Sequence, residues 1–211
     1  FAFGVREFPM GTVLNGIMQH GGLKSFGATF FVFSDYERPA IRLRALQNLP
    51  VVSEFTHDSF WVGEDGPTHQ PIEHIMAFRC MPNVNVLRPA DANEAAILIK
   101  YSFDQSKTPS MVLLTRQGLP VLDRNIYPEA ESVLKGGYVI DDAENPDLII
   151  FATGSEVNIA IEAKKLISDK KVKVVNLACW EIFEKQSKDY KESVLGDDAV
   201  FKVSLEAGVT F

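Results

Sequence analysis

The chain has 211 residues, 46% of them hydrophobic and 23% charged, and its formal net charge is -7 at pH 7. This composition is that of a globular protein with one large domain or two small ones, and it excludes a disordered chain. Binding to a nucleic-acid backbone normally requires a basic patch, so the acidic balance argues against a nucleic-acid partner. The sequence has no apolar run of the roughly 18 residues that a membrane span requires, and its first residues do not resemble a signal peptide. We therefore expect a cytoplasmic protein without a membrane segment.

Short apolar runs alternate with segments of helical periodicity in the first part of the chain. The runs at 28–33, 49–55, 84–90 and 110–115 are rich in branched and aromatic residues, which predicts strands. Helical spacing occurs at 10–18, 41–46, 72–80 and 92–101. Strands that alternate with helices of about ten residues predict a parallel sheet covered by helices on both faces.

A break in this alternation divides the chain into two predicted domains. The stretch from 118 to 137 contains Pro120, Pro128 and a pair of glycines at its end, and we predict a linker at 119–137. The alternation then resumes with strands at 147–153, 172–178 and 199–205 and helices at 156–167 and from about Glu181. The predicted fold class is α/β: a parallel-sheet domain at 1–118 followed by a second, smaller α/β domain at 138–211.

Two further features concern the ends of the chain and its cysteines. The sequence opens on "FAFGVREF" without Met and closes on "AVFKVSLEAGVTF", a strand-like run with no partner element after it, so we expect a fragment. Cys80 and Cys179 lie far apart without metal-ligand spacing. Buried thiols in a reducing compartment are therefore favoured over a disulfide.

Candidate catalytic side chains follow the second and fourth predicted strands. His57 comes directly after the second strand, and the loop "GEDGPTHQP" then presents Asp65 and His69 on a backbone shaped by glycine and proline. Arg116 follows the fourth strand. Because the carboxyl ends of parallel strands meet at one edge, these residues are expected to converge. Arginine binds phosphate through paired hydrogen bonds and histidine transfers protons near neutral pH, so the set suits an anionic, hydroxylated substrate.

Simpler interpretations compete with each of these roles. A loop histidine is commonly a solvent-facing turn residue, and the two histidines with nearby acids fit no recurrent ligand spacing, so we predict no metal site. Glu7, two residues before Pro9, is in the position of an acid that stabilises a helix dipole. Periodicity alone favours core packing over a ring-binding pocket for Phe30, Phe33 and Tyr36.

Three other polar positions are predicted to be structural. His74 and Glu94 fall on helices and are most simply solvated or capping residues. The segment "ATGSEV" at 152–157 lies between a strand and a helix, where free amides could receive a phosphate. It has one glycine, and capping of the helix by Ser155 or Thr153 is the favoured interpretation.

The motifs together resemble those of transketolases, the thiamine-diphosphate enzymes of sugar-phosphate metabolism. The stretches that carry the resemblance are "GVREF", "FGATFFVFSDY", "THDSFWVGEDGPTHQPIEH", "RPADANE", "LLTRQGLP", "LIIFATGSEV" and "NLACWEIFEKQ", and they span essentially the whole chain. The resemblance implies that 1–118 is an N-terminally truncated pyrimidine-binding domain and 138–211 a C-terminally truncated carboxyl-terminal domain. It also implies that the diphosphate-binding domain, with its Mg²⁺ or Ca²⁺, is missing from this chain.

The resemblance implies a role for each candidate residue that concerns the cofactor. Glu7 matches the catalytic glutamate that hydrogen-bonds a ring nitrogen of the aminopyrimidine, so that the cofactor removes the proton from its own thiazolium carbon. This role demands a buried carboxyl that shares a proton with a weak ring base. Phe30, Phe33 and Tyr36 match the aromatic residues that wall the aminopyrimidine.

The resemblance also assigns the substrate side of the site. His57 and Arg116 match positions that hold the substrate phosphate. Asp65 matches the acid that contacts a substrate hydroxyl next to the reacting carbon, and His69 matches the histidine close to the cofactor amino group and the substrate oxygen. His57 and His69 are expected to be catalytic together with Glu7.

The implied reaction is the reversible transfer of a two-carbon ketol unit from a ketose phosphate to an aldose phosphate, in the pentose phosphate pathway. The cofactor would be thiamine diphosphate and the enzyme a homodimer, and we expect the isolated chain to be inactive. Two alternatives stay open: a related synthase that makes dihydroxyacetone or deoxyxylulose phosphate, and a non-catalytic dimerisation half of a split enzyme. Two departures from the family pattern, Phe8 in place of histidine and Trp61 in place of a small residue, leave substrate preference open.

Overall fold

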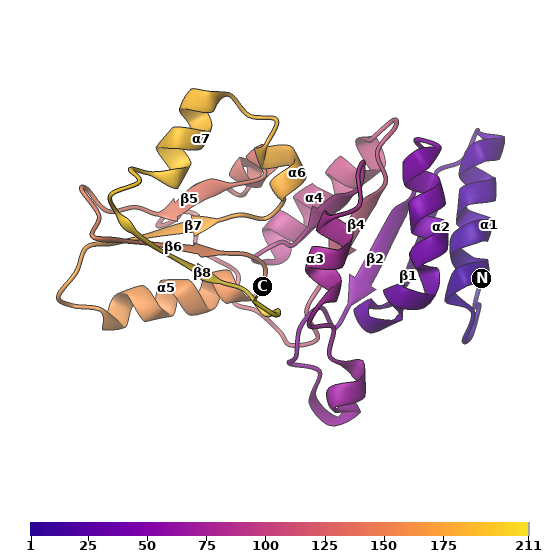
Figure 1. Ribbon diagram of the computed structural model, residues 1–211, viewed down its shortest axis with the longest axis horizontal. Helices are drawn as coiled ribbons and strands as arrows, with labels where there is room; N and C mark the ends of the chain where they lie inside the picture. Colours follow the sequence, from indigo (N-terminus) through magenta and orange to yellow (C-terminus); the bar gives the residue numbers. More distant parts are fainter. Residues whose placement is uncertain (211) are drawn as a thin grey trace. The chain divides into compact units, whose positions relative to one another are not determined.

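The computed structural model describes residues 1–210 and divides into two compact units (Figure 1). The first unit contains Phe1–Leu87, Ile99–Gln117 and the segment from Gly208 onward. The second unit contains Arg88–Leu98 and Gly118–Ala207. The domain limits that we place at 118 and 138 stay predictions. Among residues 1–210, no helix has both the length and the apolar character that crossing a membrane would require.

The first unit is built on a four-stranded parallel sheet, as the sequence predicts. Its strands are β1 (Phe26–Phe30), β2 (Val52–Thr56), β3 (Asn85–Leu87) and β4 (Ser110–Leu113), in the order β1-β2-β4-β3. The helices are α1 (Glu7–His20), α2 (Ser34–Leu46) and α3 (His74–Arg79), and the longer α4 (Ala92–Asp104) begins in the second unit. Short 3-10 turns lie at η1 (Phe31–Phe33), η2 (Gly63–Asp65) and η3 (Pro67–His69).

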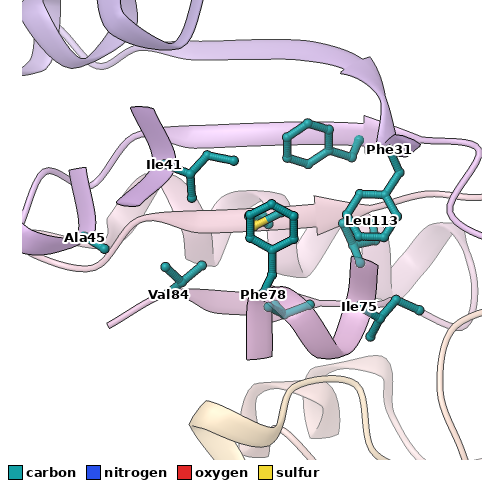
Figure 2. Packing of buried hydrophobic residues seen from close by; sticks show 10 residues of the cluster. Phe31, Ile41, Ala45, Ile75, Phe78, Val84 and Leu113 are labelled. Carbon is teal, nitrogen blue, oxygen red and sulfur yellow. The ribbon is translucent and has the colours of Figure 1, made fainter. Parts of the chain in front are cut away.

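The main core of the first unit lies where α2 and α3 pack on the sheet (Figure 2). Its side chains are apolar and buried: Phe31, Ile41, Ala45, Phe55, Ile75, Phe78, Val84, Val86, Met111 and Leu113. Helix α1 packs separately, through Met10 and Leu14 against Val51. The helices are therefore held against the sheet by their apolar faces. The loops after the strands are not needed for this packing.

The first predicted strand is displaced in the structure. We expect a strand at 28–33, but β1 ends at Phe30 and Phe31–Phe33 form the turn η1. A continuous apolar run does not distinguish a strand from a buried turn. Phe31 enters the core, with its ring 5.7 Å from that of Phe55, and the chain continues directly into α2.

The second unit is also α/β and contains one strand that the sequence analysis does not predict. Its strands are β5 (Tyr138–Asp141), β6 (Leu148–Ala152), β7 (Val172–Asn176) and β8 (Phe201–Leu205), in the order β5-β7-β6-β8. The helical elements are η4 (Ala130–Lys135), α5 (Glu156–Leu166), α6 (Trp180–Phe183) and α7 (Lys188–Leu195). The unpredicted β5 pairs antiparallel with β7, whereas the other pairs are parallel. The predicted linker supplies Leu122, Ala130 and Val133 as buried side chains of this unit.

Glu94, expected to be solvated or capping, is buried and not solvated, and its contact with the Ala90 amide just before α4 is of the capping kind. It is fully buried, and its carboxylate accepts hydrogen bonds from the Ala90 amide at 2.8 Å, from the Asn176 amide group at 3.0 and 3.1 Å, and from the Tyr138 hydroxyl. The Glu94 amide in turn donates to Asp91 Oδ1 at 2.9 Å, so Asp91 caps α4. Burial raises the pKa of Glu94, and the hydrogen bond from Tyr138 opposes this rise.

Three smaller expectations are also wrong. His74 is buried, with Nε2 3.1 Å from Asp35 Oδ2, and is not a solvated residue. Ser155 does not cap α5; its hydroxyl donates to Glu156 Oε1 at 2.6 Å. Cys179 is buried as expected, but Cys80 is exposed, and both thiols are free.

Arg88 explains the glycine of the "ATGSEV" segment. The Arg88 side chain is fully buried and donates to Glu156 Oε2 at 2.8 Å and to the Thr153 carbonyl at 3.3 Å. Gly154 has a φ of +59°, and a Cβ at this position would lie 2.8 Å from Arg88 Cζ. The Arg88 guanidinium group therefore occupies the space beside the backbone of this segment.

The burial of Glu94 generates a prediction about pH. A carboxyl whose pKa is raised in the folded state holds its proton more tightly there than in the unfolded chain, so its contribution to stability is lost as pH rises above the ordinary value of 4.5. Glu94→Gln stays neutral and lacks this loss. We expect the free energy of unfolding of the variant, relative to the original chain, to increase between about pH 4.5 and pH 7 in urea titrations. A difference that is independent of pH would contradict this account.

Candidate active site

Parallel pairing places the ends of three strands at one edge of the first sheet. Phe30, the last residue of β1, pairs with Thr56, the last residue of β2. Phe55 of β2 pairs with Leu113, the last residue of β4. The segments that follow these strands therefore start close together, which is the convergence that the sequence analysis predicts for the loops after β2 and β4.

The five predicted site residues that have rings form one connected cluster. Phe30 stacks on His57 with ring centroids 3.7 Å apart, and on Phe33 at 6.0 Å with the planes only 10° apart. Phe33 is also 6.2 Å from Tyr36 and meets the edge of His69 at 5.5 Å. Phe30 and Phe33 are half-buried and Tyr36 is 64% exposed, so these rings do not belong to the core. They form an aromatic surface that is open to a flat ligand.

Glu7 shares a groove with two of these rings. It is the first residue of α1, and the groove, of about 390 Å³, is lined by Val5–Pro9, Phe33 and Tyr36. The carboxylate is half-buried in this chain, less than the full burial that its predicted role demands. Among residues 1–210 it makes no hydrogen bond or ion pair, so it is available to a donor on a ligand.

Glycine and proline shape the loop that carries Asp65 and His69, as predicted. Gly63 and Gly66 have φ angles of +71° and +74°, which residues with a Cβ rarely adopt; Gly63 begins η2 and Gly66 follows it. Pro67 then starts η3, and the His69 amide donates to the Gly66 carbonyl at 3.1 Å. The loop is thus two successive tight turns.

Arg116 lies against this loop. A Cβ at Gly63 would be 3.1 Å from Arg116 Cζ, so the guanidinium passes directly beside the loop backbone. Arg116 and Asp65 are both exposed, and in the part of the chain that the structure describes neither side chain forms an ion pair. A cation and an acid without internal partners, both on the loops at this edge, can serve an anionic ligand that also carries hydroxyl groups.

His57 has an unusual backbone. Its φ is +59°, in the left-handed region that residues other than glycine seldom occupy. Nδ1 lies 3.0 Å from the Thr56 hydroxyl and the ring stacks on Phe30. The conformation turns the chain directly after β2 and places the imidazole on the aromatic surface. Strain of this kind is characteristic of functional positions.

The sequence analysis misses a buried ion pair beneath α1. Glu37 and Arg44 of α2 are fully or almost fully buried, and Arg44 Nη2 lies 2.7 Å from Glu37 Oε1. Burial raises the pKa of Glu37, and the positive charge of Arg44 opposes this rise. A signal existed: the two charges are seven residues apart, on the same helix face as the buried Ile41.

The two departures from the family pattern are both exposed rings, and three side chains elsewhere have a spacing that could suit a metal ion. Phe8 is 46% exposed and lines the groove with Glu7, whereas Trp61 is 55% exposed and packs on Phe60. Ligand atoms of Asp35, Glu73 and His74 lie within 4.8 Å of one another, a spacing that could hold a metal ion. Arg38 Nη1, however, is already 3.9 Å from the Asp35 carboxylate and supplies a positive charge there.

Comparison with known protein families identifies a two-domain α/β module with a pyrimidine-binding domain. Residues 1–121 match the family described as "Transketolase, pyrimidine binding domain", and residues 136–211 match the "Transketolase-like TK C-terminal domain". The first match alone covers more than half of the chain, so the chain belongs to the transketolase family.

Individual relatives agree with this assignment. The transketolases of Aquifex aeolicus and Bacillus subtilis are 48% and 49% identical over 98% and 100% of this chain, which spans 30% and 32% of their lengths. A crystal structure of a Pichia stipitis transketolase in complex with sedoheptulose-7-phosphate has a TM-score of 0.93 and 44% identity over 99% of this chain and 31% of its own. A split-gene transketolase, solved as an inactive β4 tetramer, has a TM-score of 0.72 and 26% identity over 94% of this chain and 61% of its own.

The backbone of His57 can be tested by two substitutions. His57→Ala and His57→Gly both remove the imidazole, but only alanine keeps a Cβ in the left-handed conformation, which costs about 1–2 kcal/mol. We expect the glycine variant to be the more stable of the two in urea unfolding, although glycine normally destabilises a folded chain relative to alanine. If the alanine variant were equally or more stable, the backbone strain at this position would be refuted.

Proposed function

We propose that this chain forms the pyrimidine-binding and carboxyl-terminal part of a transketolase. The reaction is the reversible transfer of a two-carbon ketol unit from a ketose phosphate to an aldose phosphate, as part of the pentose phosphate pathway. The observation that carries the proposal is the single ring cluster of Phe30, Phe33, Tyr36, His57 and His69, five residues from three separate segments of the sequence. Membership of the family supports the same conclusion.

Thiamine diphosphate is the cofactor that we propose, and the groove at Glu7 fits its pyrimidine ring. The groove offers aromatic faces from Phe33 and Tyr36 and a carboxylate without an internal partner, which are the groups that an aminopyrimidine requires. When bound, the cofactor would supply a nucleophilic thiazolium carbon and an electron sink. Glu7 would hold a proton against the pyrimidine nitrogen, and the rings would fix the plane of the pyrimidine.

The remaining residues handle the sugar phosphate. Arg116 and His57 bind the phosphate, with Arg116 providing paired N–H donors. Asp65 accepts a hydrogen bond from a substrate hydroxyl next to the reacting carbon. His69, on the edge of the Phe33 ring, moves a proton to and from the substrate oxygen.

Several properties of the whole enzyme belong to the same proposal. The diphosphate and its Mg²⁺ or Ca²⁺ are held by residues outside this chain, the enzyme is a cytoplasmic homodimer, and the chain alone is inactive. The likeness to a split-gene transketolase favours one further arrangement, in which a separate polypeptide supplies the diphosphate site.

Assays with xylulose 5-phosphate and ribose 5-phosphate, compared with formaldehyde or with pyruvate plus glyceraldehyde phosphate as co-substrates, test the reaction. If the enzyme preferred formaldehyde, or pyruvate plus glyceraldehyde phosphate, it would be a related synthase and not a transketolase.

Two substitutions in the complete enzyme separate the cofactor side of the site from its substrate side. We expect Glu7→Gln to slow deuterium exchange at the reactive carbon of the cofactor by about 10²–10⁴-fold with little change in the Michaelis constant for sugars, because it removes an acid–base group. Arg116→Ala should raise the Michaelis constant for phosphorylated sugars by about 10–100-fold and leave the exchange rate unchanged, because it removes charged hydrogen bonds.

Glu64→Gln is the matched control for Glu7→Gln, since Glu64 is an exposed acid on the same loop as Asp65. Sugars without a phosphate group are the control for Arg116→Ala and should be unaffected. Equal changes in both parameters for both variants would refute the roles assigned here.

A further inference from the structure

One guanidinium group connects three elements of the first unit. Arg44 of α2 is 1% exposed, and each of its nitrogens donates a hydrogen bond. Nε donates to Asn15 Oδ1 at 2.8 Å and Nη2 to the Gly11 carbonyl at 3.3 Å, both on α1. Nη1 donates to the Ser53 hydroxyl of β2 at 2.6 Å, and Nη2 also donates to Glu37 Oε1 at 2.7 Å.

The hydrogen bonds of Arg44 reach the two elements that position Glu7 and His57. Glu7 lies on α1 one helical turn before Gly11, so a bond to the Gly11 carbonyl anchors α1 one turn after Glu7. His57 follows β2, four residues after Ser53. A single planar group, with a fixed arrangement of donors, therefore sets the distance between the helix that begins at Glu7 and the strand that leads to His57.

The close approach of α1 and α2 makes this connection stiff. A Cβ at Gly11 would lie 2.7 Å from Glu37 Cγ and 2.8 Å from Ala40 Cβ, so the two helices touch where Arg44 bonds to both. Asn15 adds a second polar contact, since its Nδ2 donates to the Ala40 carbonyl at 2.9 Å. Glu37 is fully buried, and its carboxylate neutralises the positive charge of the buried Arg44.

We propose that Arg44 is a positioning residue that holds Glu7 in place for activation of the cofactor and His57 in place for the substrate phosphate, through its hydrogen bonds to α1 and β2. The inference rests on the proposed function, because it takes the roles of Glu7 and His57 from there. A displacement of about 1 Å at a reacting group can lower a rate by about 10²-fold. The loss of the Arg44 hydrogen bonds should therefore measurably lower the rate of cofactor activation.

A merely structural ion pair is the competing explanation, and the second unit offers a matched control. Arg88 is also fully buried and also pairs with a carboxylate at 2.8 Å, and its partners include Thr153, Glu156 and Glu206 of the second unit. Arg88→Met and Arg44→Met therefore remove equivalent buried charges. Both should destabilise the enzyme, but only Arg44→Met should alter the site.

The experiment uses the complete enzyme saturated with thiamine diphosphate, at a temperature where each variant is fully folded. We expect Arg44→Met to slow deuterium exchange at the reactive carbon of the cofactor and kcat by about tenfold or more, with a smaller change in the Michaelis constant. Arg88→Met should leave the exchange rate within about twofold of the original value. Equal slowing by both variants would overturn the proposal, because any buried arginine would then have the same effect.

If Arg44→Met does not fold, a double variant tests the positioning role of Arg44 instead. Arg44→Met combined with Glu37→Met removes both charges and restores stability, because a buried ion pair can be replaced by apolar side chains of similar volume. We expect slow exchange to persist in this stable protein, since the bonds to Gly11, Asn15 and Ser53 are still lost. Exchange at the original rate in the double variant would refute the positioning role.

The same measurement separates this inference from the proposed function. If Glu7→Gln leaves exchange unchanged, the function assigned to Glu7 fails and the inference fails with it. If Glu7→Gln slows exchange and the Arg44 variants do not, only the positioning role is wrong.

Discussion

The parallel register of β1, β2 and β4 is the constraint on which the rest of the site depends. Because Phe30 pairs with Thr56 and Phe55 pairs with Leu113, the three strands end at one edge of the sheet. Everything that follows them, the turn η1, the residue His57 and the loop that carries Arg116, then starts from that edge. Residues from distant parts of the sequence meet there because the backbone hydrogen bonds of the sheet leave no other arrangement.

The site is an aromatic surface at one edge of the first sheet, not a closed pocket. The rings of Phe30 and Phe33 are nearly parallel and half-buried, and Tyr36 is mostly exposed. Glu7 beside them is only half-buried. A carboxylate that must share a proton with a bound ring needs exclusion of water, and the ligand itself, together with parts of the enzyme outside this chain, would provide it.

The sequence predicted much of this arrangement because strand ends and turn residues leave local signals. The positions of Gly63, Gly66 and Pro67 indicated tight turns, and the structure confirms them with positive φ values and two 3-10 turns. Other features depend on tertiary contacts that no local pattern reveals. The antiparallel strand β5 lies within a stretch next to the predicted linker, and the burial of Glu94 results from partners as distant as Asn176. The polar joint around Arg44 was missed because charged residues are normally expected on the solvent face of a helix.

The most direct test of the account is a crystal structure of the complete enzyme with thiamine diphosphate bound. We expect the pyrimidine ring to lie in the groove beside Glu7, against the rings of Phe33 and Tyr36, with a ring nitrogen within hydrogen-bonding distance of a Glu7 carboxylate oxygen. A pyrimidine bound elsewhere, with Glu7 in contact only with water, would contradict the central claim.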